Sequence, residues 1–314
     1  MGQHLVSRAD LESLLGSAAS QTADPRAGIF GPASMSWKIN REAALFLGAG
    51  RAALLQLAHP WVATALEQHS SLLGNPIARF HNTFRIVFTM VFGSLGQGLA
   101  AARHLHTLHT GIRGEMPGKV AGWPQGTHYE ANEVAALRWV FATLVESAVL
   151  AYGSVCPFST EERARYYHES KTMAALFGLP AAALPEDWSG FSQYVAEMCA
   201  SDELGVGIAA REMAHTILNG AGSWVRIPRW YRALTAEWLG ARFRKEFELP
   251  WAQEDQRAAA RALRRLPRVW RALPPAVRFV GPWHEAQARL RGRMPGVVTC
   301  VSNRFWTGKR LLPF

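Results

Sequence analysis

The sequence predicts an all-α protein built as a single large helical domain. Residues that favour helices, such as Ala, Leu, Glu and Arg, recur throughout, and apolar residues repeat at helical spacing. No sustained alternation of Val, Ile and Thr with polar residues, the pattern of a half-buried strand, is present. With 314 residues, of which 49% are hydrophobic and 18% charged, the chain is long enough to bury a sizeable core.

The chain divides into three expected parts. Residues 1–34 are expected to form an N-terminal arm with a short helix over 10–19, and residues 35–250 a helical core. Gly and Pro end the helices of this core, and capping residues such as Ser159 begin them. The expected helices are 42–57, 61–72, 77–92, 98–110, 132–152, 160–177, 191–201, 205–218 and 229–247, with a loop at 114–126.

Residues 251–314 are expected to form a basic extension packed on the core. From Arg226 onward there are 19 Lys and Arg against 6 Asp and Glu. Such a region can attract an anionic membrane surface, or it can be a solvated helix face. No nucleic-acid-binding motif accompanies it, so nucleic acid is not an expected partner. Its helices are expected to be punctuated by Pro267, Pro274, Pro275, Pro282 and Pro295.

The cysteines and the apolar stretches of the sequence indicate in which cellular compartment the protein is expected. The three cysteines are scattered and form no Cys-x-x-Cys pair, which argues against a disulfide framework and against a cysteine zinc site. The N-terminus lacks an apolar signal core. The uncharged stretch 86–102 contains three glycines, which favours a helix break in a soluble core over a membrane span. A cytoplasmic location is expected, with peripheral membrane contact through the basic extension as a second possibility.

Two histidines are the first candidates for chemistry. His106 and His109 lie three residues apart, and therefore on one face of the expected helix 98–110. A neutral imidazole offered from a helix into an apolar pocket can serve as the single protein ligand of a haem iron. Zinc sites also use this spacing, but no further ligand is evident nearby. A third interpretation is a buried histidine that only satisfies a backbone carbonyl.

A second polar group lies on the expected helix 77–92. Arg79, Asn82 and Thr83 share one face of a helix that is otherwise apolar. A cation on such a surface needs a counter-charge, which a haem propionate or dioxygen would provide. The alternative is an ion pair with Glu67 or Glu42, or a contact with the C-terminus of a helix.

Beyond these two groups, an ordered set of motifs resembles one known family. The family groups the latex-clearing rubber oxygenases with the oxygenase that cleaves a farnesyl chain in mycophenolic acid biosynthesis. The resemblance spans roughly residues 37–238, and the ordered set is specific although each motif alone is not. The motifs are Trp37-x-x-Asn40-Arg41-Glu42, Gln56-x-Ala58-His59-Pro60, His69-Ser70, Asn75-Pro76-x-x-Arg79, Thr83, His109-x-x-x-Arg113-Gly114, Tyr129-x-Ala131, Trp139-Val140-x-x-Thr143 and Ala151-Tyr152.

The resemblance implies a globin-related helical core that holds one haem b. The proximal iron ligand of the rubber oxygenases is a histidine that His109 matches, with His106 as its neighbour. Their distal Arg-x-x-Lys-Thr is matched by Arg79 and Thr83, whereas Asn82 replaces the Lys and removes an amine ligand for iron. The acidic base proposed for those enzymes has no secure counterpart here.

The expected function is that of a haem b-dependent oxygenase, in which dioxygen oxidises or cleaves a carbon–carbon double bond of an isoprenoid or lipid-like substrate. Because the distal lysine is missing, a non-catalytic haem or lipid binder is the alternative. Four apolar residues either line a substrate channel or simply pack in the core: Phe84, Phe88, Leu105 and Trp139. The expected site residues are Arg79, Asn82 and Thr83 for catalysis, His109, His106, Arg79 and Thr83 for haem binding, and His109 as iron ligand.

Overall fold

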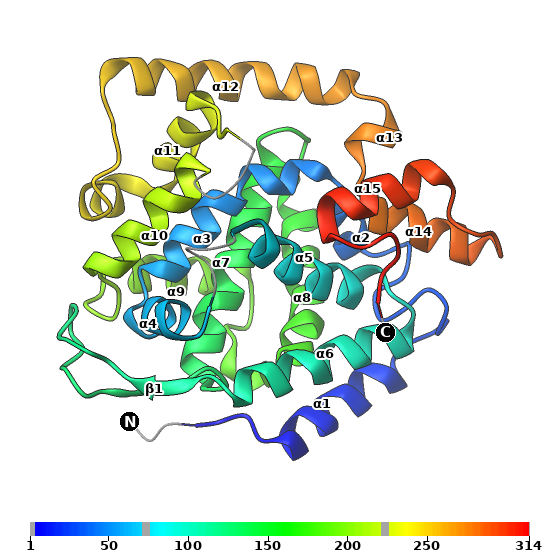
Figure 1. Ribbon diagram of the computed structural model, residues 1–314. Coiled ribbons are helices and arrows are strands. Elements are labelled where there is room, and N and C mark those ends of the chain that lie inside the picture. Colours follow the sequence, from blue (N-terminus) through cyan, green and yellow to red (C-terminus); the bar gives the residue numbers. More distant parts are fainter. Residues whose placement is uncertain (1–3, 71–75, 221–225, 314) are drawn as a thin grey trace.

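The computed structural model describes residues 4–70, 76–220 and 226–313. Within these residues the chain is helical except for one short two-stranded hairpin, which confirms the all-α prediction (Figure 1). The elements are α1 (Arg8–Ser20), α2 (Met35–Asn40), the 3-10 helix η1 (Ala43–Leu47), α3 (Ala49–Leu57), α4 (Pro60–His69), α5 (Pro76–Phe92), α6 (Leu95–Thr110), β1 (Arg113–Glu115), β2 (His128–Glu130), α7 (Val134–Gly153), α8 (Thr160–Leu176), the 3-10 helix η2 (Ala181–Ala183), α9 (Trp188–Ala200), α10 (Ile208–Asn219), α11 (Arg229–Glu246), α12 (Gln253–Ala272), α13 (Pro275–Arg278), α14 (Gly281–Leu290) and α15 (Val297–Thr307).

The central helix is α7, which is surrounded by its neighbours in Figure 1. It packs against α3, η1, α8 and α9, and Trp139 and Phe141 of α7 are fully buried. Of the described helices, α7 is the one long and apolar enough to cross a membrane. More than half of it is buried inside the fold, so core packing accounts for its apolar character.

The helices α5 and α6 form an antiparallel pair that turns at Gly93. Ser94 caps α6, because its hydroxyl accepts from the backbone of Gln97 while the Gln97 side chain accepts from the backbone of Ser94. This cap starts α6 at Leu95, earlier than the expected residue 98. Since the helices are antiparallel, the beginning of α5 and the end of α6 lie at the same end of the pair (Figure 1).

The structure differs in detail from two local expectations, and a third cannot be compared with it. The expected helix 42–57 is divided into η1 and α3 at Gly48, where the backbone of α7 is so close that an added Cβ would lie 2.5 Å from the carbonyl oxygen of Ser147. The expected loop 114–126 is bounded by β1 and β2, which are too short for their pairing to show as alternation. The end expected for helix 61–72 lies outside the described residues, which show α4 as far as His69.

Proline behaves differently inside and between the C-terminal helices. Pro267 was expected to break a helix, but α12 continues through it for 20 residues in all. A proline has a backbone φ compatible with a helix and removes only one hydrogen bond, so strong helix formers on both sides can continue the helix at a cost. The other prolines act as expected, since α13 and α14 begin at a proline in their first turn and Pro295 precedes α15.

Both ends of the chain pack onto the core. α1 lies against α6 and α8, and Leu11 and Leu15 are fully buried, so the expected arm contributes to the main core. At the other end, α14 and α15 pack on α5, and the ring of Trp306 stacks on Phe46 with 3.9 Å between ring centroids. α12 covers α11. The outer face of α5 is therefore covered by the C-terminal helices.

Candidate functional site

His109 is positioned by the last turn of α6 and is half-buried. The pKa of its imidazole is lowered to about 4, mainly by loss of solvation and, to a smaller extent, by the electrostatic influence of Arg79 and His106. The ring is therefore uncharged at neutral pH. An uncharged imidazole has one nitrogen that donates a hydrogen bond and one that keeps its lone pair.

Asn132 determines how the His109 ring is held. Its Nδ2 donates to the carbonyl oxygen of His106 at 3.3 Å and to the hydroxyl of Thr110 at 3.1 Å. Both N–H donors of the amide are thereby used, so its oxygen is left to accept the ring N–H of His109. A hydrogen bond of this direction raises the pKa of the imidazole, which is the effect that Asn132 has on His109. The second ring nitrogen then keeps its lone pair. The sequence marks Asn132 only as the start of a helix, so this partner was missed.

Arg79 lies in the first turn of α5, facing His109 closely enough for its charge to lower the pKa of the imidazole. The residue is exposed to solvent, yet the surrounding protein lowers the pKa of the guanidinium by desolvation. No carboxylate of the described residues forms an ion pair with Arg79, because Glu42 binds Arg278 and Glu67 takes part in none of these pairs.

The other two residues of the expected distal group, Thr83 and Asn82, lie in different surroundings. Thr83 is half-buried one turn after Arg79. Asn82 is exposed, and its amide oxygen accepts from Arg85. Arg85 also donates to the carbonyl oxygen of Thr307 in α15 at 3.3 Å. The side chain of Asn82 is thus held towards the C-terminal helices, although its position on the helix is one turn from Arg79.

His106 has a structural partner. Its Nε2 lies 2.9 Å from the carbonyl oxygen of Val6, in the segment that leads into α1. That segment is also held by the backbone of Val6, which donates to the carbonyl oxygen of Asn132 at 2.9 Å. The ring therefore satisfies a backbone carbonyl and lies beside His109 as an electrostatic neighbour.

Two further motif residues, His69 and Tyr129, form a polar group at the end of α4. The hydroxyl of Tyr129 donates to the side chain of Gln68 at 2.6 Å, so the Nε2 of His69, 3.1 Å from the same hydroxyl oxygen, must donate to it. Gly114 of β1 is required here, because an added Cβ would lie 2.7 Å from that hydroxyl oxygen. Burial and the charge of Glu67 raise the pKa of the tyrosine.

The four apolar residues expected to line a channel belong to two separate clusters. Phe84 and Phe88 pack with Trp37, Trp306 and other residues near the C-terminal helices. Leu105 and Trp139 pack in the main core, where the indole N–H of Trp139 donates to the carbonyl oxygen of Leu55 at 2.9 Å. These four side chains therefore do not line one channel, and core packing is the role that the structure gives them.

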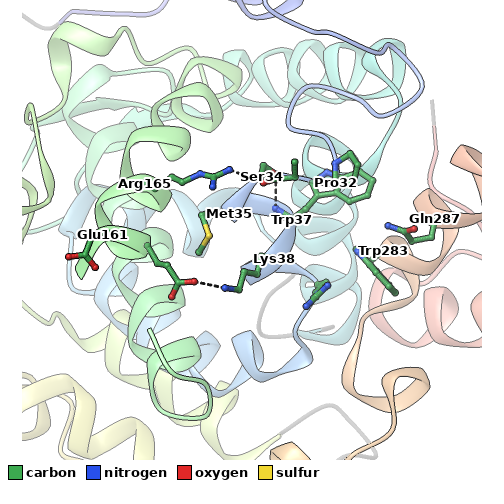
Figure 2. A pocket seen from close by; sticks show the side chains of 12 residues that line it. Pro32, Ser34, Met35, Trp37, Lys38, Glu161, Arg165, Trp283 and Gln287 are labelled. Atoms are coloured by element: carbon green, nitrogen blue, oxygen red, sulfur yellow. Dashed lines mark hydrogen bonds and ion pairs between the residues drawn. The ribbon is translucent and has the colours of Figure 1, made fainter. Parts of the chain in front are cut away.

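A surface cavity lies elsewhere in the fold. It has a volume of about 510 Å³ and is bordered by residues of α2, α8 and α14, among them Lys38, Arg165 and Trp283 (Figure 2). Two of its cations pair with carboxylates, Lys38 with Glu162 and Arg165 with Glu169. Neither Arg79 nor His109 borders this cavity. A cavity lined by so many charged side chains does not suit an apolar substrate, so the pair of His109 and Arg79 remains the candidate site.

Residues 4–70, 76–220 and 226–313 contain no group of three His, Cys, Asp or Glu side chains that could bind a metal ion, so they do not support a zinc site. The helix pair of His106 and His109 thus lacks the third ligand that a zinc site requires. The candidate site therefore consists of the neutral histidine His109 and the cation Arg79, which has no carboxylate partner among the described residues.

One family of known proteins matches this chain. The sequence model of the family described as ER-bound oxygenase mpaB/B'/Rubber oxygenase, catalytic domain, matches residues 37–272. The match covers about three quarters of the chain and runs from α2 to the end of α12, beyond the boundary expected at residue 250. It includes α5 and α6 and therefore the whole candidate site. No curated protein and no solved structure matches the chain.

Proposed function

The chain belongs to the family of the ER-bound oxygenase mpaB/B' and rubber oxygenase catalytic domain, and from this premise we propose that it is a haem b-dependent oxygenase. Membership supports an oxygenase, and hence an oxidoreductase that uses dioxygen and a small-molecule substrate. Haem as cofactor and an isoprenoid or lipid-like substrate are the proposed parts. The proposed reaction oxidises or cleaves a carbon–carbon double bond of that substrate.

The observation that supports haem most directly is the pairing of His109 with Arg79. An iron porphyrin offers a metal that accepts the lone pair of a neutral imidazole, and carboxylates that pair with a guanidinium. His109 is neutral and held by Asn132, and Arg79 is desolvated without a carboxylate partner among the described residues. The residues present therefore fit the two chemical needs of this cofactor.

Each residue has a definite role in the proposed site. His109 would hold the iron, and Asn132 would hold the His109 ring by accepting its N–H. Arg79 would bind a propionate of the cofactor. The Thr83 hydroxyl, one turn later on the same face of α5, would be a hydrogen-bond donor at the site. When bound, haem supplies the iron chemistry that activates dioxygen. The apolar surroundings of α5 and α6 would exclude water from the reacting double bond.

A second candidate function, a non-catalytic haem or lipid binder, is favoured by Asn82. The amide of Asn82 replaces the distal lysine of the rubber oxygenases and is bound to Arg85. The polar groups opposite His109 are therefore fewer than the rubber oxygenases have. Haem binding without consumption of dioxygen would support this second function.

The first test is the visible spectrum of the purified protein produced with haem supplied. We expect a Soret band in the parent and a large loss of haem affinity in His109→Ala. His104→Ala is the matched control, because His104 is an exposed histidine of the same helix and should leave haem affinity unchanged. A parent without a Soret band, or equal affinities in the parent and His109→Ala, would refute the assignment.

The second test addresses catalysis. The haem-loaded protein is incubated with farnesyl compounds and with unsaturated fatty acids while oxygen uptake and new carbonyl products are measured. Uptake accompanied by carbonyl products supports the proposed reaction, and Thr83→Val should lower the rate while haem remains bound. Haem binding with no uptake on any of these substrates would favour the second function.

A further inference from the structure

The helix α15 turns an apolar face to solvent. Val297, Val301 and Phe305 have 77%, 64% and 57% of their surface exposed. Residues four apart stack along one side of a helix, so these three form a stripe. Val298, 67% exposed, lies beside the stripe, and Met294, 84% exposed, immediately precedes the helix. We refer to these five side chains as the α15 stripe.

The α15 stripe is exposed because the opposite side of α15 is the one that packs against the protein. Asn303 and Thr307 on the opposite side of α15 are fully buried, and Asn303 donates to the carboxylate of Glu285 and to the carbonyl oxygen of Arg310. The indole of Trp306 stacks on Phe46. The helix thus buries polar side chains and exposes apolar ones, the reverse of an ordinary surface helix. A contiguous apolar surface of this kind marks an interaction site.

Five exposed cations lie close to the stripe in the sequence. Arg291 and Arg293 precede it in the chain, while Arg304, Lys309 and Arg310 lie within it or follow it, and all five are exposed. No side-chain carboxylate of the described residues forms an ion pair with any of them. From Gly281 onward the sequence has six Lys and Arg and a single acidic residue, Glu285, which is buried.

We propose that α15 docks the protein peripherally on an anionic phospholipid bilayer. The apolar stripe would enter the boundary between headgroups and acyl chains, and the five cations would bind the lipid phosphates and carboxylates. A second copy of the chain suits this surface poorly, because a two-fold contact would bring the same five cations together. The proposal does not depend on haem, and it goes beyond the proposed oxygenase function.

This assignment places membrane contact in a part of the basic region that the sequence did not single out. The run of arginines between residues 261 and 271 lies on α12, whose exposed face is mostly charged. Val269 is the one large apolar side chain of α12 among the strongly exposed ones. The α12 face is therefore that of a solvated helix, whereas α15 combines apolar and cationic groups.

Docking through α15 would also bring the candidate site close to a source of apolar substrate. α15 packs on α5, the helix that contains Arg79, and the Nε2 of His81 lies 3.0 Å from the carbonyl oxygen of Phe305. A substrate dissolved in the bilayer would be present at a high local concentration beside this helix. That consequence rests on the proposed function, whereas the docking surface does not.

The test is co-sedimentation of the full chain with vesicles of phosphatidylcholine and phosphatidylserine, and with vesicles of phosphatidylcholine alone. We expect binding to the anionic vesicles that weakens as salt is raised. The double variant V301D/F305D should bind them at least about tenfold more weakly. Ile208→Asp is the matched control, because Ile208 is 76% exposed on α10, away from the stripe, and this variant should bind like the parent.

A second pair of substitutions tests the charges without touching the stripe. The variant R291Q/R293Q should bind anionic vesicles more weakly at low salt and show a smaller salt dependence than the parent. Circular dichroism and haem affinity should be the same in all variants, which separates loss of docking from loss of fold. The proposal is overturned if the parent does not bind anionic vesicles, if Ile208→Asp loses binding equally, or if the parent is a dimer that V301D/F305D dissociates.

Discussion

At the residue scale, the charge state of His109 follows from its neighbours. Burial and the electrostatic influence of Arg79 and His106 act in the same direction, and together they outweigh the hydrogen bond with Asn132, which raises the pKa. The sequence placed His106 and His109 on one face without distinguishing them. The structure distinguishes them by partner, since His106 binds the carbonyl oxygen of Val6 and His109 binds Asn132.

Asn132→Ala should weaken haem binding by about 10–100-fold, the usual effect of losing the group that orients a metal-binding histidine. The ring of His109 would lose its acceptor and the preference for one tautomer. Haem affinity is measured by titration of the Soret band. Thr110→Val is the matched control, because it removes the hydrogen bonds of the Thr110 hydroxyl with Asn132 and with the carbonyl oxygen of His106 but leaves the amide of Asn132 beside His109, and it should bind haem like the parent. Equal affinity in Asn132→Ala would show that Asn132 does not orient the ring.

Stability of the haem-free protein should fall with acidification because of buried histidines. The imidazole of His59 is 3% exposed, and burial lowers its pKa from 6.5 to about 4. Between these values the unfolded chain binds more protons than the folded chain, so stability is lost as pH falls. From pH 7 to pH 5 each such histidine contributes a loss of about 2 kcal/mol in the free energy of unfolding.

His59→Asn tests this contribution by removing one of the two histidines whose pKa is lowered to about 4, the other being His109. Between pH 7 and pH 5, urea unfolding should show that the variant loses about 2 kcal/mol less stability than the parent does. The exposed residue His168 provides the control substitution His168→Asn, which should keep the parent's pH dependence. An unchanged pH dependence in His59→Asn would mean that this imidazole titrates normally.

At the scale of elements, one buried carboxylate connects the C-terminal helices to the core. Glu42, 1% exposed at the start of η1, accepts from Arg278 at 2.7 Å through both of its oxygens and from the indole of Trp270 at 2.8 Å. Trp270 belongs to α12 and Arg278 to α13, so three elements meet at this group. The sequence showed Glu42 only as part of a motif and offered it as a partner for Arg79.

Glu42→Gln should lower the free energy of unfolding by about 3 kcal/mol, because it leaves Arg278 largely buried beside a neutral group. Limited proteolysis should also cut the chain after residue 250 more readily. Glu254→Gln removes an exposed partner of Arg229 and should change stability by less than about 1 kcal/mol. Equal effects of the two substitutions would contradict the role assigned to Glu42.

At the scale of the whole molecule, the proposed cofactor would contact both α5, which contains Arg79, and α6, which contains His109. The core is otherwise held by α7 and by the terminal segments that pack around it. A ligand that contacts two helices binds the folded chain and not the unfolded one, and it therefore stabilises the fold. The α15 stripe lies on the outer side of the same pair, so docking and cofactor binding would use opposite faces of α5.

Haem at about 100 times its dissociation constant should raise the free energy of unfolding by about 3 kcal/mol. Thermal unfolding with and without haem measures this increase. His109→Ala should lose most of it at the same haem concentration, whereas His104→Ala should keep it. A rise of equal size in His109→Ala would mean that haem binds elsewhere or without this ligand.

The sequence by itself determined the fold class and most helices, because helix periodicity and capping are local properties. The expected helices 77–92 and 160–177 agree with α5 and α8 to within a residue, and Ser159 caps α8 as expected. The motifs likewise identified the family and the two helices of the candidate site.

Only the tertiary structure decided what each side chain binds. Asn132 meets His109, and His106 meets Val6, across about 20 and 100 residues of chain, and no local pattern indicates such partners. The packing of α15 on α5 likewise decided that its apolar side faces outward. Contacts between distant segments depend on how the helices pack together, and helical periodicity shows which residues share a face but not what that face meets.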